Sequence, residues 1–145
     1  MKDTLLSFCS LFVIFFIPGC KKGTVRATTS TSIIGSWELR QSLAMTGITN
    51  YPSGNGSTYE FTGSAYSVFS GGSIIKKGSY KIISDTTVSR EVGLIITPGE
   101  FTNRIIFDND TLSNKIFYQI KDNTLILISG YFPLDSGVKM TYEKQ

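Results

Sequence analysis

Histidine is absent from this 145-residue chain, and cysteine occurs only twice, at Cys9 and Cys20. Without histidine, the chain lacks the side chain that most often acts as a general base or a metal ligand near neutral pH. With so few thiols, a zinc site of the Cys/His type is excluded. The sequence therefore predicts a protein that is not an enzyme, with no catalytic residue, no metal ion and no cofactor.

Charge is also scarce. Charged residues make up 17% of the chain, the net charge is +3, and the basic residues are scattered. Nucleic-acid binding usually requires a basic stripe or cluster on one face, so we expect no nucleic-acid partner. Hydrophobic residues reach 41%, which is typical of a folded domain and excludes a disordered chain.

The longest apolar run lies near the N-terminus. Lys2 precedes thirteen consecutive uncharged, mostly apolar residues from Leu5 to Ile17. As a helix this run would rise about 20 Å, which is short of the hydrocarbon core of about 30 Å. The pattern of a positive start, a short apolar core and small residues predicts a secretion signal over residues 1–19. Cys9 would be removed with it.

The apolar run ends in Ile17-Pro18-Gly19-Cys20. This sequence resembles the lipobox of bacterial lipoproteins, with Pro18 as a mild departure. The resemblance implies cleavage after Gly19 and acylation of Cys20. Two or more acyl chains give stable anchoring, so membrane lipid is the expected partner of Cys20. In that family the residues after the cysteine affect sorting. Lys21, in place of aspartate, favours the outer membrane, and the absence of acidic residues just after it favours the periplasmic face.

Residues 20–32 are polar and have no apolar period, so we interpret them as the lipidated cysteine and a flexible tether. Residues 33–145 then form the folded domain. Short runs rich in aromatic and β-branched residues alternate there with Gly, Asn, Asp and Ser, which predicts antiparallel strands. The expected strands are 36–45, 58–62, 65–70, 73–77, 79–83, 91–97, 102–108, 115–121, 124–129 and 137–144.

Turn residues support this division. Gly71-Gly72 and Asp122-Asn123 each predict a tight hairpin, and Gly78 indicates a bulge. In the first strand, Trp37, Leu39 and Leu43 are expected on one face, with Glu38, Arg40 and Ser42 on the other. The rhythm of short strands predicts an all-β domain, a single antiparallel up-and-down barrel of about eight strands.

Particular residues carry a family resemblance. The domain opens with Ile34-Gly35-Ser36-Trp37-Glu38-Leu39, which is similar to the Gly-x-Trp start of lipocalin-like (calycin) barrels. Tyr59-Glu60-Phe61-Thr62, Gly78-Ser79-Tyr80-Lys81-Ile82 and the segments 118–127 and 140–144 follow in the expected order. Together they resemble the small lipocalin-like lipoproteins of Gram-negative bacteria. The resemblance implies that Trp37 closes one end of the barrel.

Two interpretations of the aromatic residues stay open. Those on the predicted strands either line an apolar ligand cavity or fill a solid core; they are Tyr59, Phe61, Tyr66, Phe69, Phe117, Tyr118, Tyr131 and Phe132. With Trp37, we take Tyr59, Phe61 and Tyr118 as the candidates for barrel closure or a cavity. A hollow barrel indicates binding of a small apolar ligand or an envelope partner. A solid barrel indicates a structural or inhibitory module that acts through its loops.

Two exposed-loop motifs remain. Asp85-Thr86-Thr87 and Asp110-Thr111-Leu112 are similar to the acceptor sequence for O-glycosylation in some exported Gram-negative proteins, which makes Thr86 and Thr111 candidate acceptors. Asp108-Asn109-Asp110 begins like a calcium loop, but it lacks the glycine and the distal glutamate at the required spacing.

Overall fold

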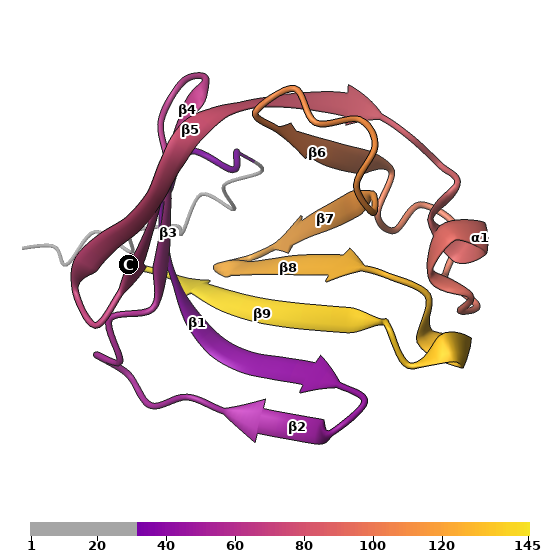
Figure 1. Ribbon diagram of the computed structural model, residues 1–145, viewed down its shortest axis with the longest axis horizontal. Coiled ribbons are helices and arrows are strands. Elements are labelled where there is room, and N and C mark those ends of the chain that lie inside the picture. The colour runs from indigo at the N-terminus through magenta and orange to yellow at the C-terminus, as the bar shows by residue number, and fades with distance from the viewer. Residues whose placement is uncertain (1–31) are drawn as a thin grey trace, which may run out of the picture.

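A computed structural model describes residues 32–145 of the protein. The predicted signal segment, Cys20 and the tether up to Thr31 lie outside the described residues. The described part is a closed, eight-stranded antiparallel β-barrel, with one short helix, α1, outside its wall (Figure 1). The predicted fold class is thus confirmed.

Nine strands and two short helical segments make up the domain. They are β1 (Gly35–Ala44), β2 (Gly47–Asn50), β3 (Thr58–Phe61), β4 (Ala65–Ser70), β5 (Ser73–Ser84), α1 (Val88–Val92), β6 (Asn103–Phe107), β7 (Ile116–Lys121), β8 (Thr124–Ser129), a 3-10 turn η1 (Phe132–Leu134) and β9 (Val138–Lys144).

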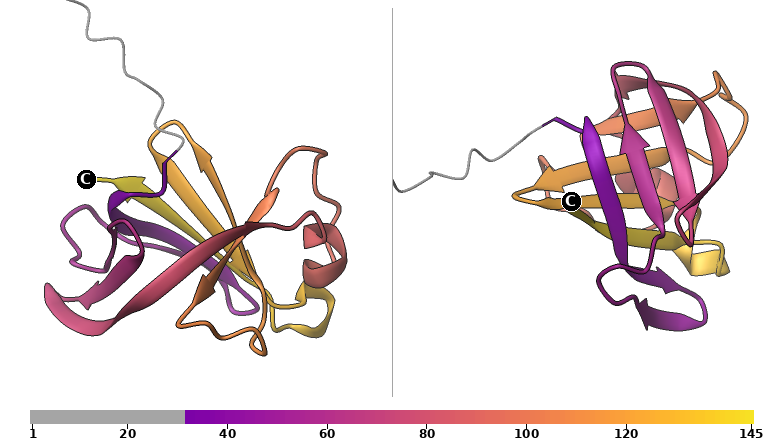
Figure 2. Two further views of the ribbon diagram at one scale, coloured as in Figure 1. Left: turned by 90° about the horizontal axis from the view of Figure 1, so that it is seen from above. Right: turned by 90° about the vertical axis from the view of Figure 1, so that its left-hand side faces the viewer.

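The barrel closes between β1 and β9. Successive strands pair from β3 through β9, and β9 pairs with β1 along its length. On its other edge, β1 pairs with β3 through its first half and with β2 through its second half. β2 therefore extends the wall as a hairpin and does not belong to the ring. The start of the described chain and the C-terminus lie at one end, where the Gln145 amide donates to the Ser36 carbonyl (Figure 2).

A bulge in β1 changes which side chains face inward. Leu39 pairs with Tyr142 and Ser42 with Met140, so that Arg40 is the extra residue. Tyr142 and Met140 both pack in the barrel core, and Ser42 therefore shares the inner face with Leu39. Leu43 moves to the outer face. The sequence predicted Leu43 on the inner face and Ser42 on the outer face. Because of the bulge, both predictions were wrong.

The stretch predicted as two strands, 73–77 and 79–83, is the single twelve-residue strand β5. Its register shift lies opposite Val68 and Phe69, where Ile75 is the extra residue, and Gly78 pairs regularly with Tyr66. The bulge predicted at Gly78 is therefore wrong. Glycine is needed there for space, because an added Cβ would lie only 1.9 Å from an Asp108 carboxylate oxygen.

The strand predicted over 91–97 is also wrong. Residues 88–92 form α1, which ends at Gly93 in the left-handed conformation with φ of 70°. Val88 and Val92 pack with Phe101, Phe117 and Ile128 in a second buried cluster. Leu125 and Leu127 face the barrel core, so Ile128 faces outward. The 85–102 connection with α1 thus covers the outer wall.

Candidate functional site

The alternating strand directions place four connections at one end of the barrel, which we call the mouth. These connections are residues 45–46, 71–72, 108–115 and 130–137. Residues 51–57 also reach this end, where the Gly72 amide donates a hydrogen bond to the Gly56 carbonyl. The opposite end, the base, holds residues 62–64, the 122–123 turn and both ends of the described chain. In eight-stranded barrels the interior is just wide enough for side chains to fill or for one small ligand.

Aromatic side chains fill the interior toward the base. Trp37 is fully buried, and its indole Nε1 donates a 2.7 Å hydrogen bond to the Ile33 carbonyl. Phe61 is also buried, lies parallel to Tyr59 at 5.5 Å and meets Tyr80 edge-on at 5.1 Å. Such pairs add to the stabilisation from burial. This part of the barrel is a solid core.

The mouth is more open. An apolar pocket of about 240 Å³ lies between the β1–β9 wall and the β4–β5 hairpin. Its lining is Leu39, Ser57, Thr58, Tyr59, Val68, Phe69, Ser70, Ile75, Met140 and Tyr142. Burial raises the pKa of both Tyr59 and Tyr142, which keeps their hydroxyls neutral at physiological pH. The pocket therefore presents an uncharged wall with two phenol groups.

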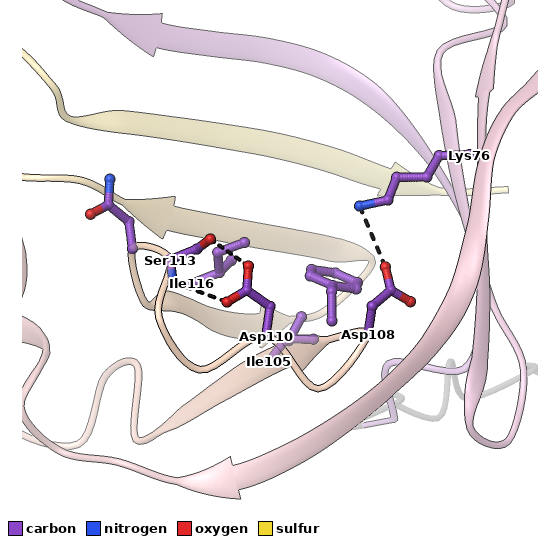
Figure 3. Close-up of a pocket in the computed structure, with 8 residues that line it drawn as sticks. Lys76, Ile105, Asp108, Asp110, Ser113 and Ile116 are labelled. Atoms are coloured by element: carbon purple, nitrogen blue, oxygen red, sulfur yellow. Dashed lines mark hydrogen bonds and ion pairs between the residues drawn. The ribbon is translucent and has the colours of Figure 1, made fainter.

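A second pocket of the same volume lies by the 108–115 connection (Figure 3). Ile105, Phe107 and Ile116 form its apolar side, while Lys76, Asp108, Asp110, Ser113 and Asn114 form its polar rim. Lys76 is paired with Asp108, and Asp110 is bonded to Ser113. Asp110 accepts hydrogen bonds from the Leu112 and Ser113 amides and from the Ser113 hydroxyl. This pocket is thus less suited to an apolar ligand.

Asp108 joins three strands at the mouth. Its carboxylate accepts hydrogen bonds from the Tyr66 hydroxyl at 2.7 Å and from the Ser79 amide at 3.0 Å. The ammonium group of Lys76 lies 3.5 Å away and over the Tyr66 ring. The Tyr66 hydrogen bond is the main cause that lowers the pKa of Asp108. Asp108 therefore stays ionised and fixes the inward direction of Lys76.

The rim of the apolar pocket is held by a carboxylate on the strand face opposite Trp37, as expected for Glu38. Glu38 is only 3% exposed because residues 51–57 fold over it. It accepts hydrogen bonds from the Gly54 and Gly56 amides, which lower its pKa, and it forms an ion pair with Arg40. The Gly56 carbonyl in turn accepts from the Gly72 amide. The glycine-rich sequence Gly54-Asn55-Gly56-Ser57 is typical of a flexible loop, and alternation along β1 alone could not reveal that it supplies these partners.

The four residues predicted to close the barrel or line a cavity do not all lie at one site. Trp37 and Tyr59 are cross-strand partners, and Phe61 follows on β3, so these three lie together. Only Tyr59 lines the apolar pocket at the mouth. Tyr118 lines two other depressions toward the base, of about 220 and 360 Å³. Sequence reasoning did not select Leu39, Val68, Met140 or Tyr142, although their apolar alternation on strands was a usable signal.

Of the other aromatic residues considered for the cavity, three face elsewhere. Phe117 and Phe132 belong to the outer cluster under α1. Tyr131 is 40% exposed beside the mouth. The sequence predicted the strands and loops that carry these residues. It did not predict which face of each strand points inward, because that depends on the pairing register of the whole barrel.

The two candidate glycosylation acceptors are both exposed. Thr86 lies in the connection that precedes α1, and Thr111 lies in the 108–115 connection. An acceptor must be accessible, so their positions are compatible with modification, which stays a prediction.

No protein-family model, curated protein or solved structure matches this chain. Within residues 32–145, no three side chains of the metal-binding types gather where they could hold an ion. The same residues contain no helix with the length and apolarity needed to cross a membrane.

Proposed function

We propose that this protein is a lipid-anchored, lipocalin-like barrel that binds the apolar part of a small ligand at its mouth. The observation that carries the proposal is the apolar pocket of about 240 Å³ lined by Leu39, Val68, Met140 and their neighbours. Ligand sites are typically concave, mostly apolar and supplied with a few polar groups. Here the polar groups are the hydroxyls of Ser57, Thr58 and Ser70 at its edge.

The closed antiparallel barrel and the buried tryptophan near its start are compatible with the calycin-like fold that the sequence resembles. Anchoring through acylated Cys20, placement in the cell envelope and an outer-membrane address are part of the same proposal. They rest on the Ile17–Cys20 pattern in the sequence.

The size of the pocket limits the ligand. Pockets for drug-sized molecules are usually larger, at about 300–1,000 Å³. Because Trp37, Phe61 and Leu125 fill the space below, a long chain cannot enter the barrel lengthwise. We therefore propose a compact apolar group, such as one ring system or a short branched chain, with the rest of the ligand outside.

The filled interior also favours a second candidate, a module that binds an envelope protein through its surface. Exposed apolar side chains occur on several segments at or near the mouth, among them Met45, Leu112 and Leu134. Under this alternative, the pocket would accept a side chain of a partner protein and would have little affinity for free small molecules.

Binding of 1-anilinonaphthalene-8-sulfonate tests the proposal. We expect fluorescence enhancement with micromolar affinity, and an increase in melting temperature, because a ligand that binds only the native state stabilises it. Val68→Trp should abolish binding by filling the pocket. Ile95→Trp is the matched control, since Ile95 is fully exposed and lies outside the pocket. Equal binding by both variants, or none by the unsubstituted protein, would reject the small-ligand site.

A further inference from the structure

The β4–β5 hairpin differs from the rest of the domain in charge. Residues 65–84 contain Lys76, Lys77 and Lys81 and no acidic residue, so this hairpin carries +3. The described residues 32–145 hold ten basic and ten acidic side chains, so the domain as a whole is neutral and its other residues together carry −3. The hairpin is therefore the basic part of the domain, although Lys76 is paired with Asp108.

The same hairpin exposes two large apolar side chains. Ile74 and Ile75, next to the Gly71-Gly72 turn, are 58% and 65% exposed. The hairpin extends beyond the other strands, at the left of Figure 1 and the lower left of the first view in Figure 2. Single exposed isoleucines are ordinary on protein surfaces, but an adjacent pair near the tip of a projecting hairpin is a site for interaction.

Apolar and basic residues follow one another in a definite order from the tip. The two isoleucines come first and Lys76-Lys77 follow directly, and at about 3.3 Å per strand residue they all lie within about 10 Å along the strand. That distance matches the depth at which interfacial segments enter a bilayer, with apolar groups at the acyl boundary and cations beside the headgroups. Anionic lipid attracts each such lysine further.

The tip is held in shape before it meets any partner. The Gly72 amide donates a 3.3 Å hydrogen bond to the Gly56 carbonyl, and a Cβ on Gly56 would approach the Gly72 nitrogen to 2.8 Å. Residues 51–57 are in turn fixed by Glu38. A rigid tip loses little conformational freedom on insertion, which favours shallow membrane contact.

We propose that the β4–β5 hairpin docks on an anionic lipid surface, with Ile74 and Ile75 in the interface and Lys77 at the headgroups, while Lys76 keeps its ion pair with Asp108. Docking would place the apolar pocket against the bilayer, because Phe69 and Ile75 belong to both the hairpin and the pocket lining. The inference goes beyond the proposed function and does not require the pocket to bind a ligand.

The expected anchor permits this orientation. From Cys20 to Ser32 the chain spans at most about 40 Å when extended. The twelve residues of β5 span about the same length. A domain anchored near its base can therefore lie on its side and bring the hairpin to the membrane.

The test uses the mature protein reconstituted into vesicles, with Ile74→Cys labelled by an environment-sensitive fluorophore. Position 74 does not line the pocket. In vesicles with about one-third phosphatidylglycerol, brominated lipid should quench the fluorescence of this label. The quenching should be weaker in vesicles of pure phosphatidylcholine and weaker at high salt. A label at Ile95→Cys is the matched control and should stay unquenched. If the label at position 74 is quenched no more than the label at position 95, the proposal is overturned.

Single charge removals separate electrostatic docking from nonspecific adsorption. Lys77→Gln should lower the docking equilibrium roughly fivefold, as expected for one lysine at an anionic surface. Lys121→Gln removes the same charge from an exposed position beside the 122–123 turn and should have no effect. Equal effects of the two substitutions, or protection of the label in the absence of vesicles, would instead indicate adsorption or self-association and overturn the proposal.

Failure of the anchor is recognised separately. Mass spectrometry of the purified protein shows whether Cys20 carries lipid. If it does not, the labelled protein with Cys20→Ser is added to preformed vesicles, and the same comparison of positions 74 and 95 decides whether the hairpin docks.

Discussion

Trp37 is the residue on which the interior depends most. It is the only tryptophan of the chain, it is fully buried, and its neighbours come from strands at opposite ends of the sequence. It pairs with Tyr59 on β3 and with Lys144 on β9, whose ammonium group lies 5.4 Å from the ring centre. The indole therefore packs across the seam where the barrel closes, and the ring also covers the chain at Ile33.

Truncation of Trp37 should be among the most destabilising single changes. Trp37→Ala removes the largest buried side chain and leaves the Ile33 carbonyl without its donor, so we expect a loss of about 3–5 kcal/mol in the free energy of unfolding. Denaturant titration measures it. Tyr131→Ala, at a partly exposed residue, is the control and should cost much less. A loss below about 1 kcal/mol for Trp37→Ala would contradict the packing described.

At the scale of elements, strands with regular alternation and clear turns were the predictable part. β4 and β8 have the predicted bounds, and β3, β6, β7 and β9 lie within two residues of them. The errors occur where local pattern competes with tertiary packing. α1 is too short to show a helical period, and its apolar residues resemble a buried strand. β2 is fully exposed and so has no apolar pattern to detect.

The site was less predictable than the strands. Hydrophobic alternation identifies inward residues within a strand, but the pocket depends on which strands lie opposite one another and on the bulge at Arg40. Glu38 illustrates the limit most clearly, because its partners are backbone amides sixteen and eighteen residues away. No composition rule links them, and only the folded path of residues 51–57 does.

The connection that carries α1 depends on a group of charges. Asp85 accepts hydrogen bonds from the Thr87 amide and hydroxyl and forms ion pairs with Arg104 and Lys115. Burial opposes its ionisation, but the hydrogen bonds from Thr87 and the charge of Lys115 outweigh that effect and lower the pKa of Asp85 to about 2. Its side chain is only 11% exposed, so solvent screens the ion pairs weakly.

Acid should weaken this connection in a defined range. Because the folded-state pKa lies below the usual 3.8, the stabilisation is complete above about pH 4 and is lost as the pH falls toward 2. Asp85→Asn should therefore cost about 2 kcal/mol at pH 7 and almost nothing at pH 2. Thermal unfolding across this range measures it. Asp122→Asn, at an exposed turn, is the control, and a difference for Asp85→Asn that stays constant across this range would contradict the assignment.

For the molecule as a whole, closure joins residues about one hundred positions apart, since β1 pairs with β9. The barrel leaves no free edge in its ring, and among the described strands only β2 ends the sheet. Such long-range pairing is slow to form, because the chain loses loop entropy before the contacts repay it. This topology could be anticipated from the strand rhythm and the Gly-x-Trp start, whereas the pocket and the charged hairpin required the folded register.

The proposed anchor makes a prediction about the location of the whole molecule. If the only strong attachment is lipid on Cys20, Cys20→Ser should shift the protein from the membrane fraction to a soluble or unprocessed form, as shown by fractionation and mass spectrometry. The docking hairpin alone gives weak, salt-sensitive binding, so any residual membrane association of the processed variant should disappear in high salt. Lys21→Ser, which keeps the cysteine, is the control and should stay anchored. A Cys20→Ser protein that is cleaved after Gly19 and still resists high salt would disprove lipid anchoring at this residue.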